Sequence, residues 1–264
     1  MISLKSPAEL DAIAAAGAIL ARLFEEIRAE IEPGVSTGEL DAFAEEFIRS
    51  HPGAEPAFKG LYGFPASLCT SVNHEVVHGI PSRRRRLDSG DILSIDAGVK
   101  LDGWFADMAV TFPVGEIEPE LDRLLQVTQA ALGAGIAAAR PGNRVGDIGH
   151  AVQTVAESAG FSVVRELVGH GLGREPHEEP QIPNYGRRGR GLRLQPGLVL
   201  AIEPMVNAGR ADVRTLADRW TVVTADQLRS AHFEHTVAIT DQGPRILTEP
   251  VPAASPGRAG PAEG

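Results

Sequence analysis

The sequence predicts an α+β fold made of two similar halves, each with a pair of helices and a group of strands. The main observation is an internal repeat, in which residues 89–96 (SGDILSID) resemble residues 196–203 (PGLVLAIE). A second match joins residues 33–40 (PGVSTGEL) to residues 141–148 (PGNRVGDI). In each half, these segments accompany a similar series of helix-like and strand-like sequence patterns. We therefore predict one interlocked domain over residues 1–249, composed of two duplicated halves.

The first half opens with a predicted helix pair. Residues 6–9 (SPAE) indicate a helix start, because serine caps a helix, proline suits its first position and glutamate completes a capping box. The apolar face that follows ends at the Pro-Gly pair of residues 33–34. Ser36 and Glu39 repeat the capping pattern and predict the start of a second helix.

The second half repeats this order. Residues 121–139 and 147–158 are predicted helices, separated by a Pro-Gly break. The predicted strands are residues 92–95, 105–112, 198–202, 220–224 and 236–240.

Residues 102–103 (Asp-Gly) indicate a two-residue hairpin turn. Such a turn places Asp96 opposite Ala109, two residues from Asp107 on the same strand face. The two carboxylates are therefore expected to point to one place.

Composition favours a soluble cytoplasmic protein. The 264 residues are 43% hydrophobic and have a net charge of −10, which argues against DNA or other nucleic acid as the main ligand. The single cysteine, Cys69, excludes an intramolecular disulfide and fits a reducing cytosol. The sequence shows no secretory signal, and the apolar run at residues 12–20 is too short to span a membrane. Residues 250–264 are rich in proline, glycine and alanine and predict a disordered tail.

Two arginine clusters stand out against this acidic background. They are Arg83, Arg84, Arg85 and Arg86, and then Arg187, Arg188 and Arg190. The simpler interpretation is a solvated loop in each case, and the alternative is a docking patch for an anionic partner such as the ribosome.

Four carboxylates and one histidine form a candidate metal site. They are Asp96, Asp107, His170, Glu203 and Glu234. Each alone can be a turn cap or a loop residue, but the carboxylates occur at matching places in the two halves. Four carboxylates at one point repel each other unless cations lie between them. The set is too anionic for a structural zinc site and suits two divalent ions, such as Mn, Co, Fe or Zn.

Two further histidines are candidate substrate ligands. Each half holds a His-Gly-aliphatic triplet, at residues 78–80 and 170–172. If His170 alone serves as a metal ligand, His78 and His177 are free for substrate contacts or proton transfer. The alternative for each is a plain loop histidine.

Several segments resemble the type I methionine aminopeptidases. They are VNHEVVHGIP (72–81), the hairpin with Asp96 and Asp107, GHGLGREPHEEP (169–180), IEPM (202–205) and FEHT (233–236). The resemblance covers nearly the whole chain. It implies a pita-bread fold, in which helix pairs back a pseudo-symmetric antiparallel sheet. It also implies a site for two metal ions and removal of the initiator methionine from nascent polypeptides.

The resemblance also implies roles for the candidate ligands. Asp96 would hold one ion, and Asp107 and Glu234 would bridge both. His170 and Glu203 would complete the second ion's site.

The same resemblance assigns the catalytic and substrate-binding residues. Glu203 would move a proton, His177 would steady the substrate carbonyl oxygen, and His78 would contact the amide nitrogen after the methionine. The methionine pocket would be lined by Phe64, Cys69 and Trp220, for which core packing is the alternative role.

Three residues depart from the family pattern. Leu61 replaces a common tyrosine and Pro176 a common aromatic residue, and both are expected to reshape the pocket. Gln227 replaces a usual turn glycine, which predicts a looser loop.

Two other functions compete with this interpretation. Aminopeptidase P and prolidase relatives carry a large N-terminal domain, whereas this chain begins directly at the catalytic half. Non-catalytic pita-bread binding proteins lose ligands, whereas all five are present here. We therefore expect a monomeric metalloaminopeptidase that acts on nascent chains with a small second residue and has no membrane partner.

Overall fold

The computed structural model describes residues 2–249, and the predicted tail at residues 250–264 lies outside them. A nine-stranded sheet forms the centre of this part of the chain. Its strands are β1 (Ala54–Pro56), β2 (Leu68–Val72), β4 (Ile92–Leu101), β5 (Trp104–Pro113), β7 (Val168–Gly171), β8 (Glu178–Pro183), β9 (Val199–Ile202), β14 (Glu234–Thr240) and β15 (Gly243–Ile246). The order is β1-β4-β5-β14-β9-β7-β8, with β2 also paired to β4 and β15 to β14.

Two three-stranded sheets complete the β structure of residues 2–249. One contains β6 (Ser162–Val163), β10 (Met205–Asn207) and β13 (Ser230–His232), and the other β3 (Glu75–Val77), β11 (Val213–Thr215) and β12 (Val222–Thr224).

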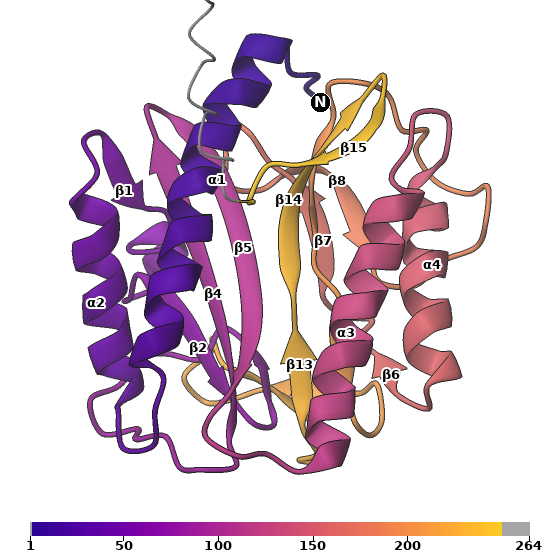
Figure 1. The fold of residues 1–264 in the computed structure, drawn as a ribbon. Helices are drawn as coiled ribbons and strands as arrows, with labels where there is room; N and C mark the ends of the chain where they lie inside the picture. Colours follow the sequence, from indigo (N-terminus) through magenta and orange to yellow (C-terminus); the bar gives the residue numbers. More distant parts are fainter. Residues whose placement is uncertain (1, 250–264) are drawn as a thin grey trace, which may run out of the picture.

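Two helix pairs cover one face of the large sheet. The helices are α1 (Pro7–Ile27), α2 (Thr37–Arg49), α3 (Pro119–Ala138) and α4 (Val145–Ser158), with short 3-10 turns η1 (Arg28–Glu30) and η2 (Leu61–Gly63). Figure 1 shows α1 and α2 beside β4 and β5, and α3 and α4 beside the other half of the sheet. Among residues 2–249, no helix is long and apolar enough to cross a bilayer.

All four predicted helices are confirmed. The hydroxyl groups of Ser6 and Ser36 each accept a hydrogen bond from the backbone nitrogen of the glutamate three residues later. The carboxylate of that glutamate accepts a hydrogen bond from the backbone nitrogen of the serine, which completes a capping box. The helix after the second Pro-Gly break begins at Val145, two residues earlier than predicted, because Asp147 accepts from the backbone of Arg144.

The predicted hairpin is also confirmed. Asp96 pairs with Ala109, and Leu101 pairs with Trp104 across a two-residue turn. Asp102 and Gly103 have φ values of 49° and 81°, as a type I′ turn requires. The first strand is longer than predicted, since β4 continues to Leu101.

The pleat of this hairpin directs its carboxylates away from the helices. Leu93 of β4 and Phe112 of β5 belong to the apolar core under α1, where Phe112 stacks on Phe24 with ring centroids 6.2 Å apart. Asp96 and Asp107 have the opposite parity on their strands, so their side chains lie on the other face of the sheet.

The two halves share a local arrangement that matches the sequence repeat. Arg86 forms an isolated bridge with Ser36 before α2, and Arg193 forms the same bridge with Arg144 before α4. The arginine-rich loop of each half therefore packs against the start of the second helix of its pair.

Candidate metal centre and substrate pocket

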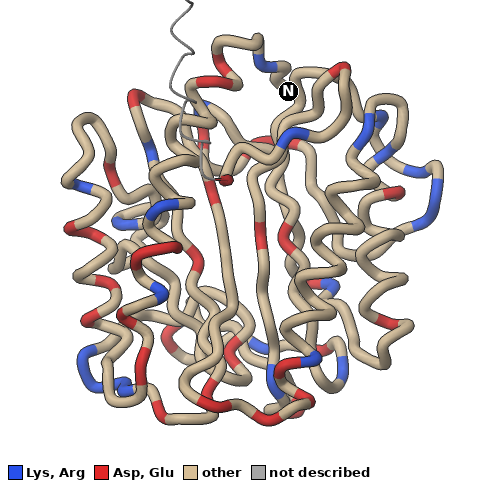
Figure 2. Tube along the Cα trace, viewed as in Figure 1, with Lys and Arg blue, Asp and Glu red and all other residues tan. Residues whose placement is uncertain are grey.

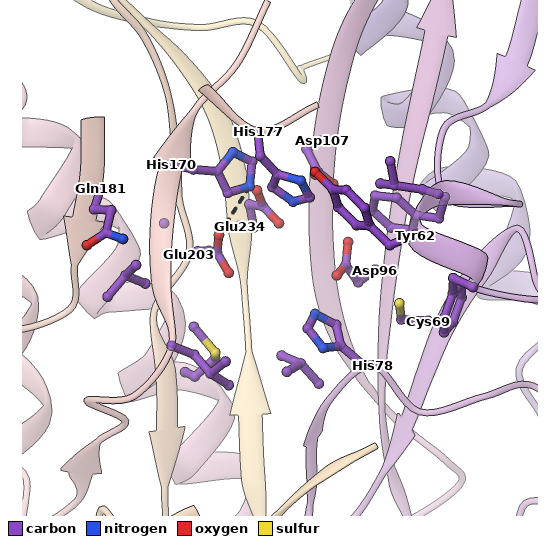
Figure 3. Close-up of a pocket in the computed structure, with 18 of the residues that line it drawn as sticks. Tyr62, Cys69, His78, Asp96, Asp107, His170, His177, Gln181, Glu203 and Glu234 are labelled. Atoms are coloured by element: carbon purple, nitrogen blue, oxygen red, sulfur yellow. Dashed lines mark ion pairs between the residues drawn. The ribbon is translucent and has the colours of Figure 1, made fainter. Parts of the chain in front are cut away.

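A cavity of about 540 Å³ lies on the sheet face that bears Asp96 and Asp107. This volume is within the range of small-molecule sites. All five candidate ligands line it, and Figure 3 shows them together with His78, His177 and Cys69.

The carboxylates meet because neighbouring strands place them in one row. Asp96 of β4 and Glu234 of β14 both pair with Ala109 of the strand between them, and Asp107 lies two residues further along that strand. Glu203 directly follows β9, which pairs with β14 on its other side. Ligand atoms of Asp107, His170 and Glu234 lie within 4.8 Å of one another.

Burial makes this cluster unfavourable without cations. It raises the pKa of Asp107 to about 7, and it raises the pKa of the other three carboxyl groups well above their usual values, with the neighbouring carboxylates adding to the effect. One oxygen each of Asp96, Asp107 and Glu234 is buried without a hydrogen-bond partner among residues 2–249. Divalent cations would satisfy these oxygens and offset the repulsion, so the donor set fits metal binding.

His170 is arranged as a neutral ligand. Its Nδ1 lies 3.0 Å from the carbonyl oxygen of Gly171, and its Nε2 lies 3.5 Å from Oε1 of Glu203. Donation from Nδ1 to the carbonyl leaves the lone pair of Nε2 directed at the carboxylates. Burial lowers the pKa of His170 to about 4, which favours the neutral ring.

His177 and His78 line the same cavity. The His177 ring packs edge-on against that of His170, with centroids 4.5 Å apart. Burial lowers the pKa of both histidines. Neither belongs to the clusters of ligand atoms that lie within 4.8 Å of one another, so both are free for substrate contacts.

An apolar pocket adjoins the carboxylates. Phe64 and Trp220 pack with ring centroids 5.1 Å apart, and Cys69 belongs to the same buried cluster. Burial raises the pKa of the Cys69 thiol, which keeps it protonated and apolar in character.

Two of the departures from the family pattern have different outcomes. Leu61 lines the cavity, as expected, but Pro176 is buried and is not one of its lining residues. The expected effect of Pro176 on the shape of the pocket stays a prediction. Gln227 has a φ of 63°, the left-handed conformation that a turn glycine adopts easily.

Two residues in or beside the cavity were not predicted from the sequence. Tyr62, with a φ of 51°, stacks on His177 with ring centroids 6.0 Å apart. His232 is 1% exposed, and its Nε2 lies 3.6 Å from Oε2 of Glu203. Burial, with a contribution from His78, lowers the pKa of His232 to about 3. No local sequence pattern indicates His232, because its partner Glu203 is distant in sequence.

A buried ion pair fixes the loop that carries His177. The Nζ of Lys5 lies 2.6 Å from Oε2 of Glu178, and the two side chains are 3% and 14% exposed. The other carboxylate oxygen of Glu178 accepts from the backbone nitrogen of Arg174. The N-terminal segment therefore holds one edge of the cavity.

We expect Lys5→Met to destabilise the fold by roughly 2–4 kcal/mol, because it leaves Glu178 buried without its cation. Turnover should also fall, since the His177 loop loses its anchor. Urea unfolding measures the first effect. Lys59→Met is the matched control, because its pair with Glu45 is more exposed, with side chains 43% and 24% accessible, and should cost less than about 1 kcal/mol. Equal stability losses in the two variants would contradict the role of the buried pair.

A sheet face that gathers carboxylates from both halves of a duplicated chain, with helix pairs behind it, is the arrangement of a metallopeptidase. Residues 11–241 match metallopeptidase family M24, and the chain belongs to this family. Methionine aminopeptidase 1 of Bacillus subtilis is 55% identical over 248 residues, which cover 94% of this chain and 99% of that protein. Methionine aminopeptidase 1 of Mycobacterium tuberculosis is 50% identical over 250 residues, 92% of this chain and 94% of that protein.

Solved structures agree with this assignment. The methionine aminopeptidase of Thermotoga maritima superposes with a TM-score of 0.92 at 44% identity, covering 94% of this chain and all of that one. A Xaa-Pro dipeptidase from Bacillus anthracis gives a TM-score of 0.76 at 21% identity and covers 93% of this chain and 61% of that one, so it shares the fold alone. The predicted pita-bread fold and the resemblance to type I methionine aminopeptidases are confirmed.

Proposed function

We propose that this protein is a metalloaminopeptidase that removes the N-terminal methionine from nascent proteins and peptides with a small second residue. The supporting observation is that the carboxylate cluster and the apolar pocket line one cavity. An apolar first side chain in that pocket brings the following peptide bond to the cation-binding groups. The relatives at 55% and 44% identity are methionine aminopeptidases, which supports the same reaction here.

Two divalent ions per chain would fit the donor set. Asp96 would hold one of them, Asp107 and Glu234 both, and His170 and Glu203 the other. Co, Mn, Fe and Zn all accept such oxygen and imidazole ligands. When bound, the pair would lower the pKa of a water and stabilise the charge that develops on the substrate.

The remaining polar groups would act on the substrate and its protons. Glu203 would take up a proton from the attacking water and return it to the leaving amine. His177 would donate to the scissile carbonyl oxygen, and His78 would contact the amide nitrogen after the methionine. Phe64, Cys69 and Trp220 would hold the methionine side chain.

Peptide hydrolysis with added divalent metal tests this function. We expect Met-Ala-Ser to be cleaved after methionine, together with peptides whose second residue is Gly, Ser, Pro or Thr. Peptides that begin Met-Lys or Met-Leu should be poor substrates. Elemental analysis should find divalent metal in active preparations. Preference for Xaa-Pro peptides without an N-terminal methionine would instead indicate an aminopeptidase P or prolidase activity.

The substrate defines where the protein would work. A nascent-chain enzyme acts in the cytoplasm, and the split ligand set within one chain supports a monomer as the active form.

The arginine loops offer a route to the ribosome, whose surface is polyanionic. All four side chains of Arg83, Arg84, Arg85 and Arg86 are exposed, as are those of Arg187, Arg188 and Arg190. The first loop packs at the start of α2 and the second at the start of α4, which lie at opposite ends of the molecule (Figures 1 and 2). The ribosome surface would therefore contact only one of the two arginine loops at a time. We propose the loop of residues 83–86, because it has four arginines and the other has three.

Co-sedimentation with ribosomes over a salt series tests this contact. Changing the four arginines of residues 83–86 to serine should weaken binding and reduce its salt dependence. The matched control changes Arg187, Arg188 and Arg190 to serine at the opposite end and should leave binding intact. Identical binding in wild type and the first variant would identify the loop as merely solvated. Cleavage of free tripeptides should not change in either variant.

A further inference from the structure

His232 is a buried histidine that no assigned role uses. It ends β13, is 1% exposed, and neither of its ring nitrogens has a hydrogen-bond partner among residues 2–249. A buried polar group without a hydrogen-bond partner lowers the stability of the fold. We therefore expect the imidazole of His232 to bond to a nearby acceptor.

The backbone of His232 is held firmly. Its N–H donates to Oγ1 of Thr111 over 2.8 Å, and the same hydroxyl group lies 2.8 Å from the His232 carbonyl oxygen. Thr111 in turn contacts the hydroxyl of Ser94 at 2.8 Å. These contacts join β13 to the β4–β5 hairpin and fix the position of the His232 backbone.

The acceptor within reach is Glu203. Its Oε2 lies 3.6 Å from Nε2 of His232, and its Oε1 lies 3.5 Å from Nε2 of His170. Potential ligand atoms of Glu203, His232 and Glu234 lie within 4.8 Å of one another. The carboxylate therefore lies between two imidazoles, one facing each oxygen.

We propose that His232 is a positioning residue that donates a hydrogen bond from Nε2 to Oε2 of Glu203 and so turns Oε1 toward His170 and the metal site. A distance of 3.6 Å is too long for the bond itself, and a side-chain rotation that shortens it by roughly 0.5 Å completes it. Partners behind a metal ligand orient it and raise its affinity for the metal. This inference rests on the proposed metal-dependent function.

Two substitutions separate hydrogen-bond donation from packing and from direct metal ligation. His232→Leu keeps much of the volume but removes the donor, whereas His232→Gln retains an N–H that can reach the same oxygen. The full chain, stripped of metal by chelation, is titrated calorimetrically with Co²⁺ alone. Turnover of Met-Ala-Ser and thermal unfolding are then measured for each variant.

We expect His232→Leu to weaken binding of the tighter Co²⁺ ion by about 10–100-fold and to lower kcat more than it changes KM. His232→Gln should remain close to wild type in both. The matched control is His235→Leu, which removes a neighbouring, half-buried imidazole that contacts Thr248 instead. It can change thermal stability but should keep the Co²⁺ affinity.

Wild-type Co²⁺ affinity in His232→Leu would overturn the proposal. Equal losses in the Leu and Gln variants would also overturn it, because an amide restores a donor but not an imidazole ligand. If the wild-type protein bound Co²⁺ but removed no methionine, the proposed function would fail. The Co²⁺ affinities of the variants would still decide the role of His232.

Discussion

Replacement of Asp107 by alanine is expected to abolish nearly all turnover and to reduce bound metal. Asp107 lies in the middle of the cluster, on the strand between those of Asp96 and Glu234, and would bridge both ions. Loss of a partner behind a metal ligand already costs about 10–100-fold. Loss of a shared ligand should therefore cost more than about 100-fold in kcat, with metal content falling in parallel.

The measurement pairs elemental analysis with initial rates on Met-Ala-Ser at saturating metal. Asp122→Ala is a suitable control, because that aspartate is exposed on α3 and its side chain accepts a hydrogen bond from Gln126, away from the cavity. A folded Asp107→Ala protein with wild-type turnover and unchanged metal stoichiometry would refute the assignment of the whole cluster.

Local patterns were sufficient to predict the helices and the long hairpin. A capping box such as that of Ser36 and Glu39 involves only neighbouring residues, so its effect can be deduced from the sequence. The two-residue turn at Asp102-Gly103 likewise fixes the register of every pair in the hairpin.

The short strands could not be predicted in the same way. The strands β3, β10, β11 and β13 have three residues each, too few for a periodic pattern. They exist because distant segments pair, as when Met205 of β10 meets His232 of β13.

The same distinction between local patterns and distant contacts applies to the residues of the candidate site. Asp96 and Glu203 could be predicted because the duplication repeats them at matching positions, and the hairpin register adds Asp107. Lys5 and His232 could not, because their partners Glu178 and Glu203 are distant in sequence and only tertiary packing brings them together. Duplication thus indicates the candidate ligands, whereas the residues that would hold them in place can be identified only from the structure.

The second large effect is expected at His177, where alanine should lower kcat without removing metal or unfolding the protein. The ring lies against His170 but outside the clusters of ligand atoms, and burial lowers its pKa so that it is a neutral donor at pH 7. Such a donor acts on charge that is present mainly in the transition state. Removing one donor of this kind typically costs about 10²–10³-fold in kcat.

The ratio of kcat to KM effects is the informative measurement for His177→Ala. A role in the transition state predicts a large fall in kcat with little change in KM for Met-Ala-Ser. Tyr62→Leu is the control, because it removes the ring that stacks on His177 but leaves the imidazole in place, and it should have the smaller effect. If His177→Ala lost metal as well as rate, the imidazole would be a ligand, and the division between metal-binding and substrate-binding histidines would be wrong.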